Sequence, residues 1–253
     1  MLIALLLSWH AYGQRIGKYG ISGGVDGQMG VKNGSFNPSI SYFELIGIGK
    51  RKSIFIGWTG RLSAFYGNNL DYITAPARLT RGEGSLRSIG KPLLIDNIDT
   101  LHDGHTAHTS LNLGIRLEYY VGRVTLGASV DLLGFTFLRH SQTDYLSSST
   151  GLFMAVDSLG RTLPKPYQGV NAYQSATPQR FNIRLLGDNN RGMLTTELYL
   201  RCQLSKEIGL KANYQWVTTE LFIGNKDIVS NNNRFRNRIT MLSIGITALI
   251  DPW

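Results

Sequence analysis

The chain has 253 residues, of which 17% are charged and 29 are glycine, and its formal net charge is +9. No apolar run reaches the roughly 18 residues of a membrane helix, so any membrane-spanning structure must consist of strands. The basic residues are scattered without a stacking motif, which argues against nucleic acid and favours contact with the phosphates of acidic lipid or lipopolysaccharide.

Residues 1–13 are predicted to form a signal peptide, and 14–253 the mature protein. Leu2 to Leu7 supply its apolar region, and Ala11-Tyr12-Gly13 is a small-x-small cleavage site before Gln14. The alternative is a buried first strand. The single Cys202 permits no intramolecular disulfide, so the backbone hydrogen bonds of the fold must stabilise an exported chain of this composition.

Eight segments alternate apolar and polar residues with the period of two of a β-strand. They are residues 16–31, 37–49, 52–67, 109–121, 124–138, 192–205, 208–223 and 235–250. Three short turns alternate with longer connections, which predicts an all-β fold: a closed antiparallel transmembrane up-and-down β-barrel of about eight strands. The long extracellular loops are expected at about 68–108 and 139–191. Strand-like pieces near Leu152–Val156 and Phe181–Leu186 extend the strands or raise the count to ten.

The segment 37–49 has two possible registers. Either Ile40, Tyr42, Ile46 and Ile48 face outward, which places Glu44 in lipid, or Phe43 and Leu45 do. A charge at mid-bilayer costs up to about 4 kcal/mol, so the second register or a bulge is expected.

The other strands separate into an apolar face and a face with small residues and a few charges. The predicted interior ionic network is Asp26, Arg61, Arg116, Glu118, Asp131, Glu197, Arg201 and Lys211. A soluble lipocalin-like carrier would invert these faces, but its exterior would be rich in Lys and Glu. Tyr119, Tyr214 and Trp216 are expected at the membrane–water interfaces, where amphipathic rings are most stable.

These features, together with the terminal Trp253, resemble the small outer-membrane barrels of OmpA, OmpX and OmpW type. The signal ending in Tyr-Gly-Gln and the segment from Val156 to Arg161 are similar to the PorT-like group of the Bacteroidota. The resemblance implies a location in the bacterial outer membrane. It covers the architecture without a family-specific motif, so no functional residue is carried over.

Two clusters have residue types suited to chemistry. His102, His105 and His108 are spaced so that a loop could bring them to one zinc or copper ion, although loop histidines without a metal are commoner. His140 and Ser141, with Asp144 nearby, are a weak candidate for hydrolysis of lipid, because neighbours on a strand point to opposite faces. No catalytic residue, metal or cofactor is therefore assigned, and the protein is expected not to be an enzyme.

The two long loops offer more residues than are needed to connect strands, and long loops are usually functional or disordered. Their apolar residues predict either a lid or a docking surface. These residues are Ile73, Leu93, Leu94, Ile95, Ile98, Leu152, Phe153 and Met154. The expected function is a binding or accessory subunit of an envelope complex for secretion, uptake or surface attachment, with a protein partner. A lipid-modifying enzyme, a narrow channel and a soluble carrier remain as alternatives.

Overall fold

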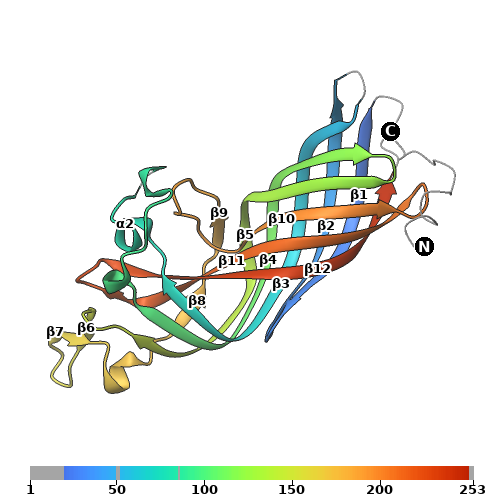
Figure 1. Cartoon of the computed structure of the whole chain (residues 1–253). Helices are drawn as coiled ribbons and strands as arrows, with labels where there is room; N and C mark the ends of the chain where they lie inside the picture. Colours follow the sequence, from blue (N-terminus) through green and yellow to red (C-terminus); the bar gives the residue numbers. More distant parts are fainter. Residues whose placement is uncertain (1–19, 50–51, 85, 251–253) are drawn as a thin grey trace.

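The computed structural model describes residues 20–49, 52–84 and 86–250, so the expected signal peptide and Trp253 lie outside the described residues. Eight antiparallel strands form a ring in the order β1-β2-β3-β4-β5-β10-β11-β12, closed by the pairing of β12 with β1 (Figure 1). The ring strands are β1 Ile21–Lys32, β2 Ser35–Ile48, β3 Ile54–Thr74, β4 Thr100–Val121, β5 Val124–Ser147, β10 Leu194–Gln203, β11 Ile208–Asp227 and β12 Asn232–Ile250. The all-β prediction and the eight ring strands are confirmed. Within the described residues, no helix is long and apolar enough to cross a membrane.

Short turns connect the strands at one end of the ring. β4 and β5 are joined by Gly122-Arg123, with Gly122 in the left-handed conformation at φ 60°. At the other end, the connection expected at 32–36 is a two-residue turn, Asn33-Gly34, with Gly34 at φ 71°. Glycine tolerates this conformation without strain, so an Asn-Gly pair between alternating segments is enough to reverse the chain.

Five strands, β3, β4, β5, β11 and β12, are at least three residues longer than the sequence predicted, and β2 is one residue longer. β3 has 21 residues, β4 has 22 and β5 has 24, whereas β1 has 12 and β2 has 14. The loop boundaries 68–108 and 139–191 are therefore wrong, because β3 continues to Thr74, β4 begins at Thr100 and β5 continues to Ser147. The long strands project beyond the β1–β2 turn and form a second part of the molecule (Figure 1). We call this part, residues 67–107, 136–193 and 219–240, the head.

The head is closed by pairings that are absent from the ring. β12 pairs with β3 through Phe235–Thr74 and Arg236–Ile73. β8 (Ala176–Pro178) pairs with β11, and β9 (Phe181–Ile183) with β5, so the sheet has ten strands although the ring has eight. The remaining head elements are the hairpin β6 (Leu152–Val156) with β7 (Thr162–Pro166), the helix α2 (Ala77–Thr80) and the 3-10 helices Leu86–Ser88, Ile95–Asn97 and Gly169–Ala172.

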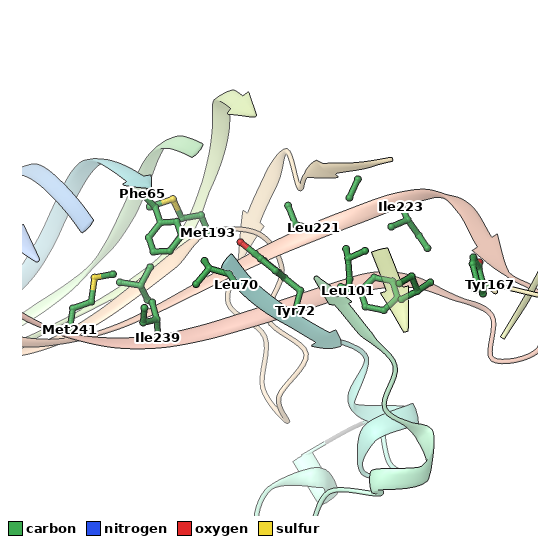
Figure 2. Packing of buried hydrophobic residues seen from close by; sticks show 14 of the residues in the cluster. Phe65, Leu70, Tyr72, Leu101, Tyr167, Met193, Leu221, Ile223, Ile239 and Met241 are labelled. Atoms are coloured by element: carbon green, nitrogen blue, oxygen red, sulfur yellow. The ribbon is translucent and has the colours of Figure 1, made fainter. Parts of the chain in front are cut away.

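The interior contains two apolar clusters. The larger one fills the head and reaches into the ring at Phe65, Val217 and Met241, and Figure 2 shows it running from Met241 and Phe65 to Tyr167 at the far end. The smaller one lies near the short turns and consists of Phe43, Leu45, Phe55 and Leu249, with Tyr120 packed against it. An apolar core in the head explains why the long strands fold there, because their inner faces are buried as in a soluble domain.

The register expected for 37–49 is wrong. Phe43 and Leu45 are fully buried in the interior, whereas Ile40 and Ile46 are 59% and 63% exposed on the outer face. Glu44 therefore points outward, where the Tyr42 hydroxyl donates to its Oε1 at 2.5 Å and Trp58 Nε1 donates to its Oε2 at 3.2 Å. These two donors satisfy the carboxylate, so placing Glu44 on the outer face costs less than placing an isolated charge there.

Candidate functional site

The interior of the ring holds a layer of charged side chains centred on two glutamates. Arg201 donates to both carboxylate oxygens of Glu118, Nη1 to Oε1 at 3.0 Å and Nη2 to Oε2 at 2.8 Å. Arg116 Nε and the Tyr199 hydroxyl also donate to Glu118 Oε1, at 2.9 and 2.6 Å. Glu118 thus accepts from three side chains on β4 and β10, which is the geometry in which a buried carboxylate is stable.

Glu197 is the second centre of this layer. Lys211 Nζ lies 2.8 Å from its Oε1, and Arg61 donates Nη1 to its Oε2 at 3.2 Å. Gln28 Nε2 donates to Oε2 at 2.8 Å and the Ser129 hydroxyl to Oε1 at 3.0 Å. The donors come from β1, β3, β5 and β11, so this one carboxylate connects strands around the whole ring.

Asp26 connects these two centres, and Asp131 extends the Glu197 centre. Asp26 accepts from Arg116 Nη1 at 2.6 Å and from Lys211 Nζ at 2.9 Å. Asp131 accepts from Arg61 Nε at 3.1 Å and from the backbone N–H of Thr195 at 2.9 Å. The eight residues of the predicted network thus share one interior, each with 1% or less of its surface exposed. Four acids face four bases, so the layer is formally neutral.

Aromatic rings flank the charged layer. The Arg116 guanidinium lies 3.6 Å from the centre of the Phe43 ring, and Lys211 Nζ lies 4.1 Å from that of Tyr199. Cations over aromatic faces are stabilised by the ring quadrupole, most strongly where water is excluded. The apolar cluster of Phe43 therefore adjoins the charges on the short-turn side, and the head core begins on the other side.

The expected interface aromatics all lie on the outer face of the ring. Tyr119, Tyr214 and Trp216 are 47%, 41% and 39% exposed. Tyr214 and Trp216 form an edge-to-face pair with ring centres 4.7 Å apart. They belong to an apolar belt around the ring. The belt comprises Met29, Val31, Phe36, Ile40, Ile46, Ile48, Ile54, Ile56, Trp58, Leu62, Leu111, Leu113, Ile115, Leu117, Leu126, Leu133, Leu198, Leu200, Leu210, Leu242, Ile244 and Ile246.

The three candidate histidines lie on β4 and not in a loop, and they do not converge. His102 Nδ1 lies 2.8 Å from Asp71 Oδ1, and His105 Nδ1 lies 2.6 Å from Asn68 Oδ1, both across the β3–β4 pair. His108 is buried with its Nε2 2.7 Å from the Thr106 hydroxyl. In the part of the chain that the structure describes, no three His, Cys, Asp or Glu side chains are grouped to hold a metal ion.

His140 and Ser141 also lie on a strand, β5. His140 is exposed and its ring centre is 5.8 Å from that of His105 on β4. The Ser141 hydroxyl donates to Asp103 Oδ1 at 3.1 Å, toward the head interior. The strand therefore directs the two side chains to opposite faces, away from the geometry of a nucleophile and its base.

The apolar loop residues divide into two groups. Phe153 belongs to the head core and stacks on Tyr167 with ring centres 4.9 Å apart. In contrast, Leu93, Leu94 and Ile95 are 45%, 41% and 80% exposed, and Leu86 and Ile89 beside them are also exposed. Phe153 therefore packs inward, whereas apolar side chains of both the 75–99 and the 139–191 segments are exposed, including Met154, Val170 and Phe181 at 46%, 86% and 70%.

One polar site in the head was not predicted from the sequence. Arg81, Arg236 and Arg238 converge on Asp188 beside a cavity of about 240 Å³. The four side chains come from three segments, each unremarkable by itself. The pairing of β3 with β12 brings the segments of Arg81, Arg236 and Arg238 together, and the segment after β9 adds Asp188.

No family model matches the chain, and no curated protein matches it. Among solved structures, it is similar to the CymD monoaromatic hydrocarbon channel, with 9% identity and a TM-score of 0.22 over 96% of this chain and 90% of that chain. It is also similar to a Pseudomonas aeruginosa FadL homologue, with 10% identity and a TM-score of 0.17 over 86% of this chain and 68% of that chain. TM-scores this low do not show a common fold, so the assignments of this chain depend on its own geometry.

Proposed function

We propose that this chain is an integral protein of the bacterial outer membrane that acts through its head, as a non-catalytic, non-conducting binding or accessory subunit of an envelope complex. The observation that carries the proposal is the distribution of polarity in the ring. Large apolar side chains cover the outside, and paired charges fill the inside. This is the inverse of a soluble barrel and the arrangement expected of a barrel in lipid.

The apolar belt supports a membrane environment over water. Its side chains are mostly 40–70% exposed and follow one another around the ring strands, well beyond the isolated apolar residues of a soluble surface. Glu44 is the one charged side chain that interrupts the belt on β2, and two aromatic donors satisfy it. A soluble lipocalin-like carrier would expose the whole belt to water, so that alternative is disfavoured.

The filled interior supports a structural role for the ring. Between the Phe43 cluster and the head core, Arg61, Arg116, Arg201 and Lys211 are among the largest fully buried side chains. Eight strands leave an interior just wide enough for side chains. A solute path would have to break several paired charges at once, which makes a narrow channel the less favoured alternative.

Conductance measurements distinguish a sealed structural ring from a narrow channel. The full-length protein is inserted in planar bilayers, and insertion is verified by the heat-dependent electrophoretic mobility of folded barrels. We expect no discrete conductance steps. A variant with Phe43→Ala, Arg116→Ala and Asp26→Ala removes one ring of the smaller apolar cluster and one neutral ion pair, and should introduce small steps if the method can detect a path through this ring. Regular steps in the unmodified protein would overturn the sealed-interior proposal.

The binding role rests on the exposed apolar residues of 75–99 in the head. A photo-crosslinking residue at Ile95 in intact cells should capture one protein in stoichiometric amount. The matched control is the same residue at Leu242, which is 69% exposed on the belt and should label lipid. Equal protein labelling at both positions, or no protein at Ile95, would contradict the subunit role while leaving the membrane assignment unaffected.

A non-catalytic role is tested separately. Unchanged lipid A in a His140→Ala, Ser141→Ala variant is expected from a non-enzyme.

A further inference from the structure

The head contains a concentration of positive charge on one carboxylate. Arg81 Nε lies 3.1 Å from Asp188 Oδ2, and Arg236 Nη1 lies 3.3 Å from Asp188 Oδ1, where Arg238 Nη2 also binds. Three guanidinium groups against one carboxylate leave two positive charges. In the ring interior, by contrast, four acids are paired with four bases, so the surplus at Asp188 differs from the balance in the ring.

A cavity of about 240 Å³ lies beside these charges. It is lined by the end of β3, the start of the 75–99 segment, the 184–193 segment and β12. Ile73, Ala75 and Leu93 form its apolar wall, and Thr74 and Thr80 contribute polar side chains. Asp71 also lies on the lining, but its Oδ1 lies 2.8 Å from His102 Nδ1. The volume suits a small charged group with a short apolar attachment.

One donor in this site is unused. Arg236 has only 4% of its side chain exposed, and its buried Nε has no hydrogen-bond partner. Its two terminal nitrogens donate to the backbone oxygens of Asp188 and Asn190, which fixes the plane of the guanidinium. An unsatisfied buried N–H costs about 1–3 kcal/mol, and a bound acceptor would remove that cost.

Burial disfavours the cationic form of two of these arginines. Burial lowers the pKa of Arg236 to about 10; the nearby carboxylate of Glu220 opposes this decrease, and Arg234 adds to it. The pKa of Arg238 is also lowered, by burial and then by the proximity of Arg81 and Arg184. The cationic forms are thus short of compensating negative charge, which a ligand would supply.

We propose that Arg81, Arg236 and Arg238 form a binding site for a phosphoryl group in the head cavity. The guanidinium groups at this cavity outnumber its carboxylates, which favours an anionic ligand, and guanidinium groups bind phosphate oxygens in bidentate geometry. The group could belong to free phosphate or to a phosphorylated lipid headgroup. The site extends beyond the proposed function and does not depend on whether the ring conducts or on a protein partner.

The test is isothermal titration calorimetry on the folded, detergent-solubilised full chain. Inorganic phosphate and pyrophosphate are the soluble probes, and micelles with lipopolysaccharide, intact or dephosphorylated, are the lipid probes. Arg238→Gln should weaken binding about tenfold or more, as expected for loss of one charge-assisted bond. Asp188→Asn should strengthen binding, because it removes the competing carboxylate while Asn tolerates the φ of 63° at this position.

The chain offers a matched control in the β6–β7 hairpin. Arg161 and Asp157 form an Arg–Asp pair with Nε and Oδ2 2.9 Å apart, outside the cavity. Arg161→Gln and Asp157→Asn change the net charge by the same amounts as Arg238→Gln and Asp188→Asn, respectively. They should leave binding unchanged. If phosphate binds, and binding is weakened by Arg238→Gln and strengthened by Asp188→Asn, the ligand is a soluble phosphate. If only phosphorylated lipopolysaccharide binds, the ligand is a lipid headgroup. Absence of binding in both the unmodified and the Asp188→Asn proteins, or equal effects of the control variants, would overturn the site.

Discussion

Arg201 and Glu118 face each other across the ring interior through two parallel hydrogen bonds of 3.0 and 2.8 Å, with both side chains fully buried. Neither charge is stable there without its partner. We therefore expect Glu118→Ala to lower the free energy of unfolding by about 3–5 kcal/mol, because it leaves Arg201 unpaired. The measurement is urea unfolding in liposomes, followed by tryptophan fluorescence.

The exposed pair of Lys91 and Glu83, 3.1 Å apart in the head, is the control for this prediction. Glu83→Ala should cost less than about 1 kcal/mol, because an exposed pair is screened by water. The double variant Glu118→Leu, Arg201→Met should recover much of the loss, since it removes both charges together. Similar losses for Glu118→Ala and Glu83→Ala would show that the interior network contributes little.

Gly127 is required where the Tyr199 ring crosses β5. A Cβ added at Gly127 would lie 2.1 Å from Tyr199 Cζ, so the ring would have to leave its position beside Glu118. Gly127→Ala should lower the free energy of unfolding by about 1–3 kcal/mol, the usual cost of overpacking. At Gly27, on the outer face of β1, a Cβ would meet no atom within 4 Å, so Gly27→Ala should be neutral or stabilising. The same urea titration compares the two variants, and equal losses would contradict the packing argument.

Glu44 tests the environment of the outer face. Tyr42→Phe and Trp58→Phe each remove one donor from its carboxylate, and each should lower the free energy of unfolding by about 1–3 kcal/mol. In a Glu44→Leu background both effects should vanish, which a double-mutant cycle in liposomes measures directly. If the aromatic substitutions cost as much in that background, their role is packing and not hydrogen bonding.

Asp99, next to the start of β4 in the head, should make stability depend on pH. Burial raises the pKa of its carboxyl above the usual value for an aspartate; a hydrogen bond with Ser148 opposes this increase, and Asp227 adds to it. The folded state therefore holds the proton more tightly than the unfolded state, so this contribution to stability is present at low pH. It is lost as the pH rises through the folded pKa.

Asp99→Asn removes this titration. The difference in free energy of unfolding between the variant and the unmodified protein should grow in favour of the variant as the pH rises from about 4 and then level off. Taking the difference cancels the titration of the other carboxylates. A difference that does not change over this range would contradict the role assigned to Asp99.

The strand period made much of the ring predictable. Alternation from 193 to 216 places Glu197, Arg201 and Lys211 on one face, because neighbouring side chains on a strand point to opposite sides. The alternation does not show which side chains on other strands these residues contact. Lys211 meets Asp26, 185 positions away in the chain, and only the closure of the ring brings the two together.

The strand-like piece Leu152–Val156 is confirmed as β6, but the extension of the ring strands into the head was not predicted, for a different reason. β4 contains register shifts between His102 and Asp103 and between Asp103 and His105, so the period of two is broken where β4 enters the head. A bulge moves later side chains to the other face, and the segment then looks like a polar loop in the sequence. The register of 37–49 was missed because the cost of a charge was considered without the donors Tyr42 and Trp58.

The pairing of β1 with β12 has a consequence for the order of assembly. Residues Gly23–Val31 bind residues Leu242–Ile250 through nine consecutive registered pairs, and the Thr247 hydroxyl donates to Asp26 across 221 positions of sequence. Closing so long a span is slow, and until it happens the first and last strands both present unpaired backbone groups. Ribosomal synthesis cannot complete this seam until the last strand has been made. A newly made chain therefore has to be kept from joining its free edges to those of another copy until its own two ends have met.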